Sequence, residues 1–461
     1  MKTTLEGAWM RHGFAALAVA VSLTIAGCAT APHPEKDLTA TTEDGNLVPL
    51  DSVTFSYDVG GVHVIQRPSF GNDVVSVHLY LLGGTRQLSP ATQGIEKLLL
   101  RTSEYGTATY PGDATRAAWA RTGSQLLVSA DDDWTLFGFR GVHSEFDSSW
   151  NVFAERVMHP TLASKDVALV RSQMIGALRQ RINDPDSYAM MLADSIAFAG
   201  HPYGLQTSGT EASLESLDSA ALARYQATQM VTSRMLLVAV GSLSRSQLEA
   251  AVARTLARLP AGNYVWTLPE PLPASPSSVT MIQRPIATDY ILGLFQGPPA
   301  TDKDYAALRV ATALLSSQMH SEIREEHALS YAAGAPYIER GIGTGAVYVS
   351  TGAPSTVLPM IRKAMKEMKQ LDWGMISMRY FTDQFVMDFL AENMTSTAQA
   401  DFLARAQLYR GDYHLAGKSM EELRHLTSPQ LRSVARKYFQ NIHFVYLGDT
   451  TRVPRSAFEG F

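Results

Sequence analysis

The sequence predicts an α+β fold in which two homologous domains each form a mainly antiparallel sheet with helices packed on one side. The first observation is a repeat, because Ile-Gln-Arg-Pro occurs both in VIQRPSFGNDVVSVHLYLLGG from Val64 and in MIQRPIATDYILGLFQGPP from Met281. The second is that strand-like and helix-like stretches alternate in the same order after each copy. The third is the segment LPEPLPASPSS between the copies, which is too rich in proline for a helix or a central strand. With 461 residues, the chain is long enough for two full cores.

The strand and helix patterns agree between the two halves. The strand-like stretches WTLFGFR, from Trp134, and AVYVSTG, from Ala346, each precede apolar residues at helical spacing. These residues are Phe146, Trp150, Phe153 and Val157 in the first half, and Val357, Ile361, Ala364 and Met368 in the second. The halves also close alike, with MLLVAVG ending at Gly241 and HFVYLGD ending at Asp449. We therefore expect domains at 51–258 and 279–461, joined by a linker at 259–278.

The N-terminus predicts export and a lipid anchor. Lys2 and Arg11 precede an apolar run from Phe14 to Ile25 that is too short for a stable membrane span. The run ends in Ile-Ala-Gly-Cys28, which resembles the bacterial lipobox, and Cys28 is the sole cysteine. We expect 1–27 to be a lipoprotein signal peptide, Cys28 to be lipidated and 28–50 to be a polar tether. Ala29, in place of aspartate, favours the outer membrane of a Gram-negative bacterium, with the protein in the periplasm. A lone thiol behind an ordinary signal is the alternative.

Composition and motif searches exclude several functions. A net charge of -5 without a basic block argues against nucleic-acid binding. There is no Gly-x-Ser-x-Gly elbow, and none of the twelve histidines lies in His-x-x-Glu-His. Asp131, Asp132 and Asp133 lack the spacing of a cation-binding loop, so we expect them to form the solvated end of a hairpin.

Short motifs in a fixed order carry a family resemblance. They are Gly83-Gly84-Thr85, Gly94, Tyr105-Gly106-Thr107, Tyr110-Pro111, Gly123-Ser124-Gln125, His201-Pro202-Tyr203-Gly204 and Gly209-Thr210. In this order they resemble the insulinase or pitrilysin-like family of zinc peptidases, over nearly the whole mature chain. The resemblance implies that the two domains are insulinase-like.

The same resemblance implies that the zinc site is degenerate. Aligned on Gly94, the family's His-x-x-Glu-His falls on 97–101, so that Lys97, Leu100 and Arg101 replace the two histidines and the catalytic glutamate. The third ligand, a glutamate, falls at or near Ala177. A protonated lysine has no lone pair to offer zinc. Two cations about 4 Å from a dication would each cost about 8 kcal/mol at an effective dielectric of about 20. We expect no metal here, and expect Lys97 and Arg101 to pair with Glu96 or Glu104.

In the second half, the resemblance assigns functional roles to Arg324 and Tyr331. The family carries an arginine and, seven residues later, a tyrosine that face the zinc across the chamber. A guanidinium and a phenol can hold a peptide carbonyl and the oxyanion that forms from it. The family's substrate-binding strand falls at 126–130, although Leu127 stands where asparagine is expected. An edge strand can still bind an extended peptide through its main chain.

The resulting prediction is a subunit that is inactive alone and binds substrate for a zinc-bearing homologue with His-x-x-Glu-His. Zinc would be held by that partner, and this chain would carry no cofactor. The pair would cleave peptides. One alternative is a periplasmic peptide-binding or scaffold lipoprotein without proteolysis. The other is an autonomous peptidase, which the missing metal and nucleophile disfavour.

Overall fold

The computed structural model describes residues 53–370 and 372–461. The signal peptide, Cys28 and the tether lie outside these residues, so the predictions made for them stay predictions. Within the described part, no helix has both the length and the apolar composition needed to cross a bilayer.

The first domain contains one six-stranded sheet with the order β1-β2-β6-β3-β5-β4. Its strands are β1 (Phe55–Val59), β2 (Val62–Pro68), β3 (Val74–Leu82), β4 (Gln125–Ala130), β5 (Trp134–Val142) and β6 (Met235–Gly241). Only β2 and β6 pair in parallel, and every other neighbouring pair is antiparallel. The strand β4 therefore lies at one edge, paired only with β5.

The second domain repeats this arrangement. Its strands are β7 (Ser278–Gln283), β8 (Asp289–Gln296), β9 (Ser330–Gly334), β10 (Tyr337–Ile338), β11 (Thr344–Thr351) and β12 (His443–Gly448). The order is β10-β11-β8-β12-β7, with β9 also paired to β11. Each Ile-Gln strand, β2 or β7, pairs in parallel with the last strand of its own half, β6 or β12. The repeat found in the sequence is thus a repeat of sheet topology, as predicted.

Helices of the first domain cover one face of its sheet. They are α1 (Ile95–Thr102), α2 (Asp113–Thr122), α3 (Phe146–Met158), α4 (Ser164–Asn183), α5 (Pro185–Ala197), α6 (Glu211–Ser216), α7 (Ser219–Gln229) and α8 (Arg245–Arg254). The predicted apolar face of α3 is buried in this core, where Trp150 packs against Phe153. The exception is α5, which leaves its own domain.

The second domain follows the same plan. Its helices are α9 (Tyr305–Met319), the π-helix η8 (His320–Glu326), α10 (Pro354–Met368), α11 (Met375–Glu392), α12 (Ser396–Arg410), α13 (Leu415–Arg424) and α14 (Ser428–Tyr438). The predicted apolar residues of α10 are all buried. The fold class predicted from the sequence is therefore confirmed.

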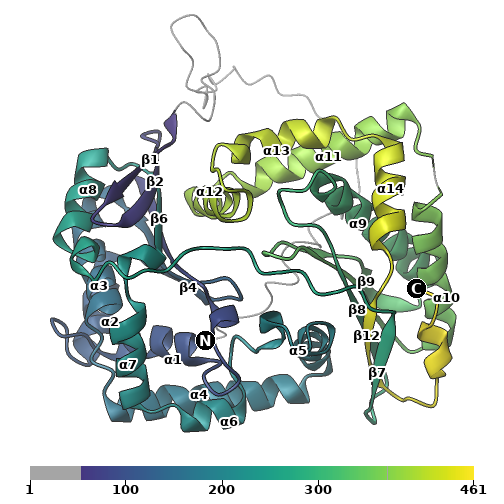
Figure 1. The fold of residues 1–461 in the computed structure, drawn as a ribbon, viewed down its shortest axis with the longest axis horizontal. Coiled ribbons are helices and arrows are strands. Elements are labelled where there is room, and N and C mark those ends of the chain that lie inside the picture. The colour runs from purple at the N-terminus through teal and green to yellow at the C-terminus, as the bar shows by residue number, and fades with distance from the viewer. Residues whose placement is uncertain (1–52, 371) are drawn as a thin grey trace, which may run out of the picture.

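The two domains exchange one helix each across the space between the sheets (Figure 1). Helix α12 packs on β3 and β6 of the first sheet, and α5 packs on β8 and β12 of the second. Each helix brings an aspartate to the sheet it covers. Asp401 of α12 lies 3.0 Å from Nδ1 of His78 on β3, and Asp186 of α5 accepts a 2.7 Å hydrogen bond from Tyr348 on β11. The second face of each sheet is thus covered by the other domain.

The connection between the domains is extended and crosses from one lobe to the other (Figure 1). Residues 260–277 form no helix or strand. Its aromatic side chains are nevertheless anchored, since Trp266 donates a 2.8 Å hydrogen bond to the carbonyl of Leu408 and lies under Arg86. The segment therefore adds packing between the domains as well as covalent continuity.

Candidate functional site

Helix α1 is held in place by two glycine motifs that are distant in sequence. Gly94 begins the helix with a φ of 90°, and a Cβ atom there would lie 2.8 Å from Cα of Gly209. A side chain at position 94 would therefore meet both backbone strain and a steric clash. The segment around Gly209 contributes a side chain as well, because Ser208 Oγ accepts a 2.7 Å hydrogen bond from Nζ of Lys97.

The structure places cations together at the positions that the family resemblance assigns to the zinc ligands. Lys97 and Arg101 lie on one face of α1, which packs against α4. Ala177 is exposed on α4, and Arg181 lies one turn later on the same helical face. Burial, together with nearby Arg181 and Arg101, lowers the pKa of Lys97 to about 8, while Asp131 opposes the shift. Arg181 was not singled out by the sequence reasoning. Its spacing of four from Ala177 was the available signal.

The expected pairing of Lys97 and Arg101 with neighbouring carboxylates is wrong. Glu96 points into the core and pairs with Arg234 at 3.0 Å. Glu104 lies 3.4 Å from Arg156 instead. Both carboxylates pair with buried arginines, because a buried charge without a counter-ion costs more free energy than a half-exposed one.

The residues at these positions do not fit zinc. Zinc sites require imidazole, thiolate or carboxylate donors, and Lys97, Leu100, Arg101 and Ala177 supply none of them. Among residues 53–370 and 372–461, no group of three or more histidine, cysteine, aspartate or glutamate side chains could hold a metal ion. No step of chemistry is therefore assigned to a metal in this chain.

The strand predicted to hold substrate lies at a sheet edge beside α1. Strand β4 contacts α1, and within the described residues no strand pairs with its outer edge. Its free main-chain groups can accept an additional strand. Leu127 is partly buried there.

Arg324 and Tyr331 lie in an irregular segment of the second domain. Arg324 belongs to the π-helix η8, a rare element that is frequent at functional sites. Between the two residues, Ala328 adopts a φ of 51°, a conformation that costs a non-glycine residue about 1 kcal/mol or more. The guanidinium of Arg324 lies 4.8 Å from the ring centre of Tyr331. The structure thus brings the two predicted residues into contact.

A β-bulge turns Tyr331 outward. In the pairing of β9 with β11, Ser330 lies opposite Thr351 and Ala332 opposite Ser350, so Tyr331 has no partner. Ser330 Oγ supports the bulge with hydrogen bonds to the carbonyls of Ala332 and Ser350. Tyr331 is 83% exposed. Bulges next to active sites commonly re-aim a side chain, and here a tyrosine is presented to solvent without contributing to the core.

The interpretation of the three aspartates as a solvated hairpin end holds for Asp131, which is exposed, and is wrong for Asp132 and Asp133, which are partly and fully buried. They do join β4 to β5, but Asp133 is 1% exposed. Its carboxylate accepts hydrogen bonds of 2.8 Å from Tyr203 and 2.9 Å from Tyr409, and forms an ion pair with Arg86. No sequence pattern could signal this burial, since the partners come from both domains and lie far away along the chain.

Asp132 belongs to the same inter-domain network. It pairs at 2.9 Å with Arg340 of the second domain, which also binds Asp194 of α5 at 2.8 Å. Arg340 is sandwiched between these carboxylates and the rings of Phe198 and Tyr203. The hairpin end is therefore a joint between the domains.

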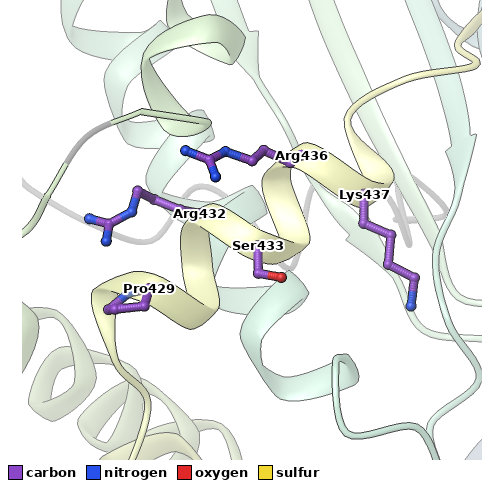
Figure 2. A pocket seen from close by; sticks show the side chains of 5 residues that line it. All are labelled: Pro429, Arg432, Ser433, Arg436 and Lys437. Atoms are coloured by element: carbon purple, nitrogen blue, oxygen red, sulfur yellow. The ribbon is translucent and has the colours of Figure 1, made fainter.

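A surface pocket on α14 is a poorer candidate. Figure 2 shows its lining side chains, which are Pro429, Arg432, Ser433, Arg436 and Lys437. Its cations already have partners: Arg432 pairs with Asp372, Arg436 bonds the carbonyl of Lys369, and Lys437 pairs with Asp304. Surface cations whose charges are balanced by neighbouring groups in this way are typical of a solvated helix and do not indicate a binding site.

Fold and site together define a two-domain, peptidase-like protein that lacks the His-x-x-Glu-His motif. The family models agree with this class. The model for insulinase, peptidase family M16, matches residues 64–211, and the model for the peptidase M16 inactive domain matches residues 216–381. Together they match more than half of the chain. The chain belongs to the insulinase family, peptidase family M16.

Individual relatives are distant. A probable mitochondrial-processing peptidase subunit beta from Arabidopsis thaliana is 20% identical over 260 residues, which are 56% of this chain and 49% of that protein. The chain thus spans about half the length of this curated relative. A peptidase M16 inactive domain from Pseudomonas fluorescens superposes with a TM-score of 0.79 at 20% identity, over 86% of this chain and 98% of that one. The periplasmic protease PqqL from Escherichia coli superposes with a TM-score of 0.71 at 12% identity, over 90% of this chain and 49% of that one. At these identities the superpositions show the fold.

Proposed function

We propose that this chain is the non-catalytic, substrate-binding subunit of a periplasmic, heterodimeric zinc peptidase of the M16 family. A homologue that carries His-x-x-Glu-His would hold the zinc. This chain would supply Arg324 and Tyr331, which bind the peptide carbonyl and the oxyanion that forms when water attacks it. The observation that carries the proposal is the exposed Tyr331, held out on a bulge against Arg324.

The contrast between the two domains supports this division of labour. The first domain lacks zinc ligands, so the chain needs a second protein to supply the metal. In the second domain, by contrast, the donors flank a strained residue, since Ala328 adopts a positive φ between them. This chain also superposes on 49% of the periplasmic protease PqqL, so a chain of this size corresponds to about half of that protein.

The test is a mixing experiment with a homologue from the same organism that carries His-x-x-Glu-His. The mixture should cleave peptides that neither protein cleaves alone, because the donors and the metal-bound water must meet across one chamber. Tyr331→Phe removes only the hydroxyl and should lower kcat by about 100-fold, the scale for one lost oxyanion donor. Arg324→Lys keeps the charge but loses the planar fork, so it should also impair turnover.

Tyr380→Phe is the matched control, since Tyr380 is another exposed tyrosine, on α11, and its loss should leave kcat unchanged. Full activity of Tyr331→Phe would overturn the role assigned to this half-site. If the mixture binds peptides without cleaving them, the alternative holds, a peptide-binding or scaffold lipoprotein with a degenerate peptidase fold.

A further inference from the structure

We infer that the cationic cluster of Lys97, Arg101 and Arg181, which stands where the family holds its zinc, binds a carboxylate of a peptide lying along β4. The inference deepens the proposed function, on which it rests, by naming the class of peptide that the first domain selects. The carboxylate can be the peptide's C-terminus or an aspartate or glutamate side chain. These two sources share one chemistry and are separated by the test below.

The three cations lie around the positions that the family resemblance assigns to the zinc ligands. Lys97 and Arg101 replace two former ligands on α1, and Arg181 lies one turn after Ala177, the third former position. Long side chains on a helix extend back over the preceding turn, so Arg181 reaches over the space that Ala177 leaves open. The depressed pKa of Lys97 agrees with this placement, because Arg181 and Arg101 are among its causes.

These cations have few partners in the described part of the chain. Lys97 bonds only the neutral hydroxyl of Ser208. The side chains of Arg101 and Arg181 form no hydrogen bond or ion pair with any described residue. The carboxylate that lies near enough to affect Lys97 is that of Asp131, which already accepts a hydrogen bond from Ser129. The cluster therefore keeps an excess of positive charge, which disfavours folding and favours an incoming anion.

The neighbouring strand makes a peptide the fitting source of that anion. Strand β4 contacts α1 and offers its unpaired edge to an extended chain. The last residue of β4 is Ala130. The next residue, Asp131, lies close enough for its negative charge to raise the pKa of Lys97. A peptide paired with β4 can therefore place a carboxylate near the cluster. Main-chain pairing supplies affinity without sequence preference, and the cations add a preference for negative charge.

The experiment measures peptide binding by the full mature chain without its partner. The probes are three Val/Thr peptides of about eight residues, long enough to pair with all of β4 (Gln125–Ala130), each carrying an uncharged fluorophore. The first ends in a free carboxylate, the second is amidated, and the third is amidated with one internal glutamate. We expect the first or the third, or both, to bind about tenfold more tightly than the second. Whichever binds identifies the source of the carboxylate.

Variants locate the site. The site variants are Lys97→Met, Arg101→Met and Arg181→Met. Each should raise the Kd of the acidic peptide about tenfold and leave the Kd of the amidated peptide unchanged, so that most of the preference is lost. Lys165→Met is the control, because it removes an exposed charge from the first turn of α4, about 24 Å along the helix from Arg181. The three site variants should unfold at the same or a higher temperature than the wild type, because each removes a repelled cation.

Binding should also take up protons. Near pH 8 a carboxylate beside Lys97 raises the fraction of this lysine that is protonated, so the acidic peptide should bind with uptake of a fraction of a proton that Lys97→Met abolishes. Calorimetry in buffers of different ionisation enthalpy measures this uptake. A merely structural lysine would not produce it.

Equal affinity for all three peptides would overturn the inference, as would unchanged binding by the three site variants. Competition by inorganic phosphate as tight as the peptide itself would mean an adventitious ion only. These failures are distinct from failure of the proposed function. A mixed complex that cleaves neutral peptides through Tyr331 would keep the proposed function while removing the preference for acid.

Discussion

Glu96 is the residue on which the position of Lys97 depends. Its side chain is almost fully buried and holds Arg234 at 3.0 Å, the hydroxyl of Tyr225 at 2.5 Å and the hydroxyl of Thr135. These contacts connect the first turn of α1 to β5, to α7 and to Arg234, the residue before β6. A buried ion pair is costly to break because the remaining charge stays buried without a counter-ion.

Glu96→Ala should therefore lower the free energy of unfolding by about 3–5 kcal/mol. Denaturant titration measures this change. Glu211→Ala is the control, since Glu211 pairs with Arg179 on the exposed surface and its loss should leave stability nearly unchanged. Equal effects of the two substitutions would show that burial of the Glu96 pair does not determine its contribution.

At the scale of elements, the hairpin between β4 and β5 couples the two domains. Burial raises the pKa of Asp132 to about 7, with Arg340 opposing and Asp194 and Asp133 reinforcing the shift. The folded state therefore holds a proton on Asp132 at pH values where the unfolded chain, with an ordinary aspartate pKa near 3.9, does not. The stability contributed by this group is full below about pH 4 and is lost as pH rises through about 7.

Asp132→Asn should remove that dependence. Between about pH 4.5 and 6.5, the unfolding free energy of the wild type should fall with rising pH more steeply than that of the variant, by about 1 kcal/mol per pH unit. Asp113→Asn, at an exposed position on α2, should keep the wild-type slope. Parallel profiles for wild type and Asp132→Asn would mean that Asp132 titrates normally in the folded protein.

The same hairpin shows where reasoning from the sequence fails. Periodicity predicted β5 and the apolar faces of α3 and α10, because each depends on residues close together in sequence. Asp133 looked solvated because adjacent carboxylates usually are, and its partners Tyr203 and Tyr409 come from two domains. The functional pairing of Arg324 with Tyr331 was predicted from a motif with fixed spacing, and the contact between them is seen only in the structure. The bulge that exposes Tyr331 depends on pairing with β11, which the motif does not encode.

At the scale of the whole molecule, the exchanged helices make the two domains one unit. The repeat predicted two similar domains, but an apolar helix face does not specify which sheet it covers. Helix α12 completes the first sheet and α5 the second, and the linker packs across both. The half-site at Tyr331 and the cationic cluster at Lys97 are therefore held on opposite domains of a single body. The fold therefore keeps both sites in place at once, as the proposed substrate-binding role requires.

A separate prediction concerns the cellular location of this chain and rests on Cys28. The lipobox-like run ends at this residue, and a lipid on it would restrict the chain and a similarly exported partner to one compartment. Cys28→Ser should release the protein into the soluble periplasmic fraction or leave it as an uncleaved precursor. Fractionation and intact-mass measurement distinguish these forms. Because Cys28 is the sole cysteine, a thioether-linked lipid on the wild-type chain can be assigned to it without further variants. A wild-type protein that fractionates without lipid as a soluble species would refute the anchor while leaving both binding sites unaffected.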